Sequence, residues 1–167
     1  LPNNLNSGTT YFVTIKPYNG NGETTGSCEV FEFTTCEAIF ELNEGFDELF
    51  DNPLPNCWNK LIVSTNLEFP PTIRINEEEM YINSGENTND NIFAILPPIG
   101  NLSEATHRLH FKAKEYWGAS NILHIGVLSN INDPLSFQLI ATKTLTNEYA
   151  EYFITIPANI IGKNIAF

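Results

Sequence analysis

The sequence feature that most constrains the fold is a two-residue alternation of apolar and basic side chains in residues 106–115. The apolar-facing set is His107, Leu109, Phe111 and Ala113, and the other set is Arg108, His110, Lys112 and Lys114. Successive side chains of a β-strand point to opposite faces of the sheet, so the alternation predicts a strand with one apolar and one basic face. The apolar face resumes at Leu123, Ile125 and Val127 after a turn in residues 116–121, which predicts a long hairpin.

Further strands are expected along the rest of the chain, each bounded by turn residues. They cover residues 11–18, 29–35, 57–63, 92–96, 135–142, 151–156 and 165–167, with shorter ones around Ile73 and Tyr81. No segment has the period of a helix of three turns. Short strands with turns every 8–12 residues or so are typical of a sandwich or jelly roll. The sequence therefore predicts an all-β, jelly-roll β-sandwich.

The negative net charge of the chain limits the classes of binding partner that can be expected. The chain has 20 Asp and Glu against 8 Lys and Arg, a formal net charge of -12. Nucleic acids and anionic membranes are negative too, so neither is an expected partner. The longest apolar runs are only a few residues, so no membrane insertion is expected.

Three cysteines, Cys28, Cys36 and Cys57, allow three single pairings with one thiol left over. None forms a Cys-x-x-Cys pair with another, and no His stands at zinc-ligand spacing, which argues against a zinc site. We predict a disulfide between Cys36 and Cys57, which would contribute about 3 kcal/mol by closing the loop between them. A β protein with one disulfide indicates an extracellular location.

Residues 1–35 carry one resemblance. Five residues separate Leu5 from Tyr11, and the strand that begins there is followed by an Asn-Gly loop at residues 19–22 and by Phe33-Thr34-Thr35. This resembles the last two strands of a fibronectin type III domain, in which a tyrosine at the position of Tyr11 forms the tyrosine corner. We therefore expect residues 1–35 to be a partial fibronectin type III domain, and the chain to be a fragment of a longer protein.

Residues 36–167 carry another resemblance. In order, the chain has Cys36, Glu44-Gly45-Phe46-Asp47, Pro55-Asn56-Cys57-Trp58, Ala94-Ile95-Leu96-Pro97-Pro98, Leu109-His110-Phe111 and Ile165-Ala166-Phe167. This order resembles the MAM-like, cleaved-adhesin type jelly roll of secreted Bacteroidetes proteins. Two features depart from that family: residues 59–63 replace an Asp/Gly-rich run, and the closing strand is absent.

The second resemblance implies a function. Such modules are adhesive or accessory parts of larger surface proteins, often exported by type IX secretion. We therefore expect a non-catalytic adhesion or binding module that is secreted or displayed at the cell surface, where its ligand is a glycan or a protein. The alternative is a carbohydrate-binding accessory module of an extracellular hydrolase.

A structural calcium ion is also implied, because many jelly rolls bind Ca²⁺ through a carboxylate near the first strand. Asp47 matches that position, Glu44 could assist, and the polar loop that ends at Asp90 could supply more oxygens. The alternative is that these are solvated acidic residues of a negatively charged protein.

Two aromatic residues, Tyr116 and Trp117, stand in the expected hairpin turn beside Gly118. Such a pair could stack on a sugar ring, since an aromatic face is an apolar platform in water. Alternatively, the two rings fold back over the edge of the sandwich. Trp58, which lies between Cys57 and an apolar run, is expected in the core.

No catalytic constellation is evident. Neither a Gly-x-Ser-x-Gly nor a His-Glu-x-x-His motif occurs, and the acidic residues 77–79 are expected to be a solvated run. His110 and His124 would lie about 13 Å apart along the expected hairpin, too far apart to share a metal. We expect no enzymatic activity from this chain.

Overall fold

The computed structural model describes residues 5–16, 18–19, 22–23, 29–46, 54–65, 68–84, 90–116 and 121–167. The chain forms two compact units, Leu1–Ala38 and Ile39–Phe167, each described by itself below. Among the described residues, the helices are two 3-10 turns, Leu102–Glu104 and Pro134–Ser136, and the other regular elements are strands. The predicted all-β class is confirmed. None of the described helices is long and apolar enough to cross a lipid bilayer.

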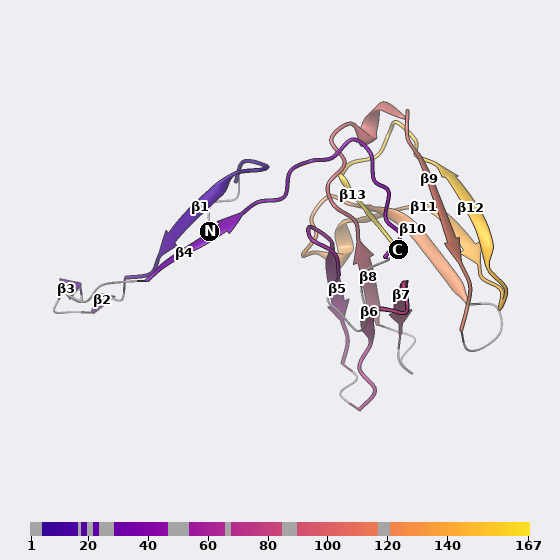
Figure 1. Cartoon of the computed structure of the whole chain (residues 1–167), viewed down its shortest axis with the longest axis horizontal. Coiled ribbons are helices and arrows are strands. Elements are labelled where there is room, and N and C mark those ends of the chain that lie inside the picture. The colour runs from indigo at the N-terminus through magenta and orange to yellow at the C-terminus, as the bar shows by residue number, and fades with distance from the viewer. Residues whose placement is uncertain are drawn as a thin grey trace. The chain divides into compact units, whose positions relative to one another are not determined.

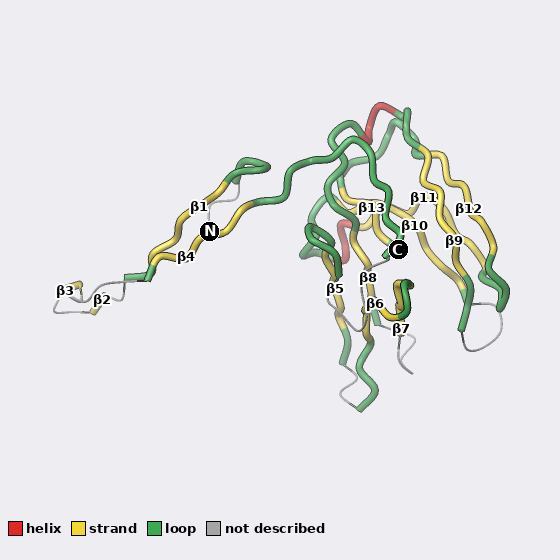
Figure 2. Tube along the Cα trace, viewed as in Figure 1, coloured by secondary structure: helices red, strands yellow, loops and turns green. Residues whose placement is uncertain are grey.

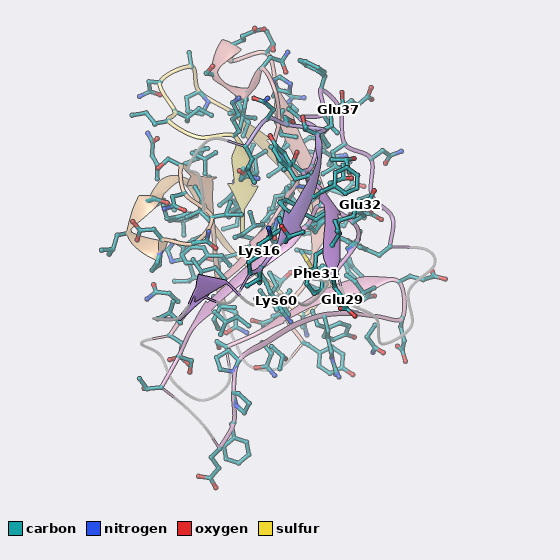
Figure 3. The ribbon with its side chains drawn as sticks, turned by 90° about the vertical axis from the view of Figure 1, so that its left-hand side faces the viewer. Lys16, Glu29, Phe31, Glu32, Glu37 and Lys60 are labelled. Carbon is teal, nitrogen blue, oxygen red and sulfur yellow. The ribbon has the colours of Figure 1, made fainter. Side chains whose placement is uncertain are left out.

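The first unit is built on an antiparallel pair, β1 (Thr10–Thr14) and β4 (Val30–Thr34). A shorter pair, β2 (Tyr18–Asn19) and β3 (Gly22–Glu23), lies between them in sequence. Phe31 and Glu32, adjacent on β4, are labelled in Figure 3. Because side chains alternate along a strand, Phe31 shares a face with Phe33, while Glu32 belongs to the opposite face.

Tyr11 is the residue on which the fibronectin type III resemblance depends. It lies opposite Phe33, and the two rings stack with centroids 5.6 Å apart. The backbone N–H of Asn6 donates to the Tyr11 hydroxyl at 2.7 Å, which ties the segment before β1 to the strand. This is the kind of local contact that a tyrosine corner requires. The family assignment of residues 1–35 stays a prediction.

The second unit contains a five-stranded sheet with the order β11-β10-β13-β8-β5 and two antiparallel pairs, β9–β12 and β6–β7 (Figures 1 and 2). The strands are β5 (Asn59–Val63), β6 (Thr72–Asn76), β7 (Glu79–Asn83), β8 (Asn91–Ile95), β9 (Arg108–Ala113), β10 (Ile122–Leu128), β11 (Phe137–Thr144), β12 (Ala150–Thr155) and β13 (Asn164–Ala166).

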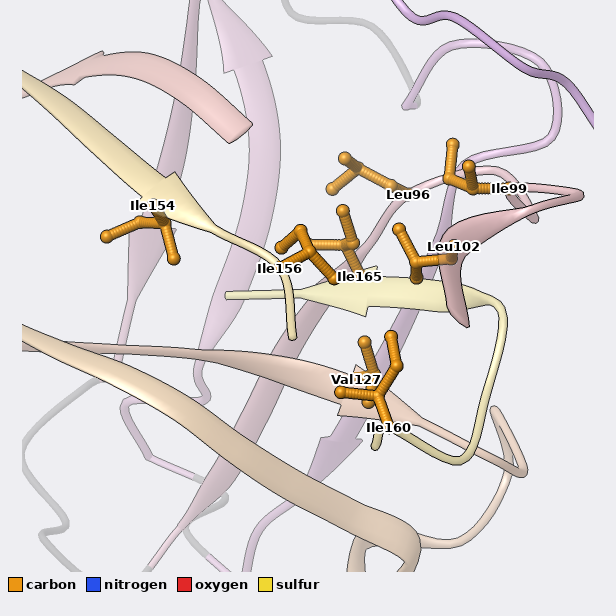
Figure 4. Packing of buried hydrophobic residues seen from close by; sticks show 8 residues of the cluster. All are labelled: Leu96, Ile99, Leu102, Val127, Ile154, Ile156, Ile160 and Ile165. Atoms are coloured by element: carbon orange, nitrogen blue, oxygen red, sulfur yellow. The ribbon is translucent and has the colours of Figure 1, made fainter. Parts of the chain in front are cut away.

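The larger of two buried clusters lies between the five-stranded sheet and the β9–β12 pair, and the other consists of Phe93, Ile95, Leu128 and Ala166. Val127 of β10 and Ile165 of β13 pack in one cluster with Ile154 of β12, and all three are buried. Figure 4 shows this cluster, which Leu96, Ile99, Leu102, Ile156 and Ile160 complete. Leu109 and Phe111 of β9 pack against the same cluster. The two layers thus face each other across one apolar interior, which is consistent with a β-sandwich.

The alternation in β9 has the predicted orientation, but the predicted hairpin is wrong. Leu109 and Phe111 are partly buried, whereas Arg108, His110 and Lys112 are exposed. β9 pairs with β12, and β10 pairs with β11 and β13, so residues 106–115 and 122–128 belong to different sheets. Their apolar faces meet across the core rather than side by side. Alternation reports which face is buried, and it carries no information on the neighbouring strand.

The last strand of the chain has a central position. β13 lies between β10 and β8, with Ile165 opposite Val127 and Ala166 opposite Ile95. Ile165 and Ala166 are buried, and Leu96 donates its backbone N–H to the Ile165 carbonyl at 2.9 Å. The three residues of β13 therefore join two halves of the five-stranded sheet.

Candidate ligand-binding site

Three tyrosines gather where β7, β9 and β12 approach one another. Tyr81 lies on β7, Tyr116 lies three residues after the end of β9, and Tyr149 immediately precedes β12. Lys114 and Glu79 lie among them. We call these five residues the tyrosine cluster.

Lys114 is at the centre of the tyrosine cluster. Its Nζ lies 4.2 Å from the centroid of the Tyr149 ring and 3.9 Å from Oε1 of Glu79. The Tyr149 hydroxyl donates a hydrogen bond to the same Glu79 oxygen. Glu79 therefore contacts both the Lys114 ammonium and the Tyr149 hydroxyl, and the ammonium lies against the Tyr149 ring.

These contacts shift two pKa values upward. The side-chain hydrogen bond to Tyr149, together with the charge of Glu79, raises the pKa of Lys114 above its usual value. Partial burial and the hydrogen bond to Glu79 raise the pKa of Tyr149. At neutral pH the cluster thus presents an ammonium group and a neutral phenol, both in contact with Glu79.

Tyr81 and Tyr116 extend the cluster. Their rings meet edge to face with centroids 5.8 Å apart and an interplanar angle of 62°. Cζ of Arg74 lies 5.9 Å from the centroid of the Tyr81 ring. Tyr116 keeps 61% of its surface exposed and Tyr149 keeps 50%. The Tyr116 ring thus contacts β7 through Tyr81 and keeps most of its surface exposed, and both alternatives for its role, sugar stacking and folding back over the sandwich edge, stay predictions.

The position of Glu79 depends on the turn before it. Glu77 and Glu78, with φ of 51° and 65°, form the two-residue turn between β6 and β7 in the left-handed conformation. Both are exposed, as expected for a solvated acidic run. The expectation fails for Glu79, whose carboxylate is engaged by Tyr149 and Lys114. Sequence reasoning missed this because both partners are far away along the chain.

The cluster offers both apolar faces and hydrogen-bonding groups to a ligand. An exposed tyrosine ring offers an apolar face to the C–H groups of a sugar, and its hydroxyl can donate or accept a hydrogen bond. The ammonium of Lys114 and the carboxylate of Glu79 add a fixed donor and a fixed acceptor beside the rings.

Glu44 and Asp90, the remaining predicted site residues that the structure describes, make hydrogen bonds outside this cluster. Trp117 and Asp47 lie outside the described residues. Glu44 accepts the backbone N–H of Phe46 at 2.8 Å, and Asp90 accepts the Ser64 hydroxyl at 2.5 Å. The described part of the chain contains no group of three His, Cys, Asp or Glu placed to hold a metal ion. A calcium site that uses Asp47 stays a prediction.

Cys36 and Cys57 are each disulfide-bonded, and the predicted pairing of one with the other stays a prediction. Trp58 packs against the main core cluster and meets Phe46 edge to face at 5.5 Å, so its predicted core position is confirmed.

The two outward histidines have separate surroundings. His110 stacks on Phe153, and Nδ1 of His124 lies 3.4 Å from the Thr142 hydroxyl. The distance expected between them assumed a hairpin that does not form, so that estimate no longer applies.

Of the residues that form the tyrosine cluster, sequence reasoning named Tyr116 as a ligand-binding residue and missed Tyr81 and Tyr149. Each of these lies at or beside a strand, a weak signal that becomes meaningful only once the strands are paired. The chain matches no family model, and no curated protein or solved structure was found to be similar to it.

Proposed function

We propose that this chain is a non-catalytic binding module that recognises carbohydrate, as part of a larger secreted or surface protein. The observation that carries the proposal is the convergence of three tyrosines from separate segments around Lys114 and Glu79. Exposed aromatic faces beside fixed charged groups suit a ligand that has both apolar C–H faces and hydroxyl groups.

The disulfide-bonded cysteines support the proposed extracellular setting. Cys36 and Cys57 are disulfide-bonded, and disulfides persist in oxidising compartments. A module of this kind could attach its parent protein to a host or environmental glycan. It could equally hold a hydrolase domain close to its polysaccharide substrate, which was the alternative drawn from the sequence.

A glycan array followed by calorimetry tests the proposal. The purified chain is screened on plant, algal and host glycans, and each hit is repeated with Tyr116→Ala and Tyr149→Ala. Losing one stacking contact of roughly 1.4 kcal/mol weakens binding about tenfold. Leu135→Ala, which removes a highly exposed apolar side chain before β11, is the matched control and is expected to bind as the parent does.

Two results would contradict the proposal. One is the absence of binding to any glycan on the array. The other is binding that neither tyrosine substitution weakens. Bound oligosaccharides are expected to be recovered uncleaved after long incubation, and release of new reducing ends would show an enzyme instead.

A further inference from the structure

The exposed face of the β9–β12 pair is a regular ladder of cations and aromatic rings. The register places Arg108 opposite Thr155, His110 opposite Phe153, and Lys112 opposite Glu151. We call Arg108, His110, Lys112, Glu151 and Phe153 the β9–β12 ladder. Directly paired residues of an antiparallel sheet share a face, so all of these side chains project from the face turned away from the core.

The ladder residues contact one another closely. His110 and Phe153 stack with centroids 4.3 Å apart and an interplanar angle of 2°, and Cζ of Arg108 lies 5.7 Å from the Phe153 centroid. Glu151 lies 3.4 Å from Nζ of Lys112 and 3.6 Å from Nε2 of His110. Phe153 nevertheless keeps 52% of its surface exposed. The contacts hold the side chains in place and leave the Phe153 ring, the His110 imidazole and the charged groups of Arg108 and Lys112 facing solvent.

The ladder continues into the tyrosine cluster. Ala113 pairs with Ala150, so Lys114 and Tyr149 form the next row, and Nζ of Lys114 lies over the Tyr149 ring. From Arg108 to Lys114 the strand direction spans about 20 Å, with a cation or histidine roughly every 7 Å. This is long enough for several sugar units of an extended chain.

The charge of this strip differs from that of the rest of the chain. Arg108, Lys112 and Lys114 are three of the eight Lys and Arg residues in a chain with 20 acidic residues. Glu151 and Glu79 offset two of these charges, which leaves the strip positive by one with His110 neutral, against a chain total of -12. The strip is therefore a local attractor for anions on an otherwise repulsive surface.

We propose that the ligand is a linear acidic polysaccharide that lies along β9, with its rings on the aromatic side chains and its carboxylate or sulfate groups beside the cations. This inference rests on the proposed carbohydrate-binding function and adds the class of ligand. A repeating anion matches the repeating cations of the strip. The net charge of the chain opposes the long-range approach of any polyanion, so the match is local to the strip. The sugar hydroxyls find acceptors in Glu151 and Glu79.

Calorimetry with the intact chain tests the inference. The probes are polygalacturonate, which carries carboxylates, dextran sulfate, which carries sulfates, and xyloglucan, which is neutral. The double variant Arg108→Gln/Lys112→Gln is expected to bind the acidic polymer at least about tenfold more weakly than the parent does. Affinity for the acidic polymer is expected to fall as salt is raised, because exposed charges are screened.

The matched control is Lys60→Gln/Lys163→Gln, which removes two exposed positive charges elsewhere and changes the net charge equally. It is expected to bind as the parent does, and circular dichroism checks that both variants fold. The difference between carboxylate and sulfate probes shows which anion is preferred, and binding to either one supports the inference.

Three outcomes overturn the inference. In the first, both double variants weaken binding equally, which would reflect net charge alone. In the second, a single-stranded oligonucleotide binds more tightly than the polysaccharides. In the third, neutral and acidic glycans bind equally well and only the tyrosine substitutions matter. The third outcome leaves the proposed carbohydrate-binding function intact, whereas binding to no glycan at all rejects both.

Discussion

Gly126 in β10 occupies a position at which a side chain has no room. A Cβ there would lie 2.3 Å from the carbonyl oxygen of Gln138 and 2.6 Å from the ring of Phe137. The register with β11 shifts between Ile125 and Gly126, so a bulge brings the neighbouring backbone close. We expect Gly126→Ala to lower the free energy of unfolding by about 1–3 kcal/mol, measured by urea denaturation. A loss below about 0.5 kcal/mol would show that β11 and the Phe137 ring move aside at little cost.

Tyr149 and Lys114 should make stability fall at alkaline pH. The folded state raises both pKa values, so around pH 10 it binds more protons than the unfolded state does. Stability is therefore fully present below the unfolded pKa values and is lost as pH rises through the folded ones. We expect Tyr149→Phe to flatten this loss in urea unfolding measured between pH 8 and 11.

Tyr152→Phe is the control for that experiment. The Tyr152 hydroxyl donates to the Thr144 carbonyl at 3.3 Å, so this variant also loses one phenol and one hydrogen bond, but outside the tyrosine cluster. Equal slopes for the Tyr149 and Tyr152 variants would show that the Glu79 and Lys114 contacts do not couple to folding.

At the scale of elements, the β6–β7 hairpin carries a turn with unfavourable residues. Glu77 and Glu78 both have positive φ, a conformation that costs a non-glycine residue roughly 1–2 kcal/mol. Two-residue hairpin turns of this kind prefer Asn-Gly. We expect Glu77→Asn/Glu78→Gly to raise the free energy of unfolding by about 1–2 kcal/mol, seen as a higher melting temperature. Glu77→Ala/Glu78→Ala, which removes the charges and keeps the strain, should not reproduce the gain.

The strands also show how much of the fold could be predicted from the sequence. The alternation in residues 106–115 and the proline stop after residue 96 are local signals. They predicted the two faces of β9, which is two residues shorter at each end, and the end of β8 to within one residue. The pairing of β9 with β12 joins segments about 40 residues apart, and no local pattern specifies it. The prediction of the candidate site was incomplete for the same reason. Tyr116 was named from its own turn, while Tyr81 and Tyr149 join it only through strand pairing and layer packing.

At the scale of the molecule, the integrity of the five-stranded sheet depends on β13. Without residues 164–167, the pairs β11–β10 and β8–β5 lose the strand that joins them, and Ile165 and Ala166 leave the core. Ala94 would also lose both of its backbone hydrogen bonds with Phe167, at 3.1 and 3.0 Å. These losses together approach the 5–15 kcal/mol or so that stabilises a typical domain.

We therefore expect a chain that ends at Lys163 to lose its cooperative urea transition and its dispersed amide proton spectrum. Ile165→Ala keeps the strand and removes only side-chain volume, so it should cost about 2–5 kcal/mol and keep a single transition. If the truncated chain still unfolds cooperatively with an unchanged urea dependence, the halves of the sheet hold together without β13. The sandwich core between β9–β12 and the sheet would then be sufficient by itself to maintain the second unit.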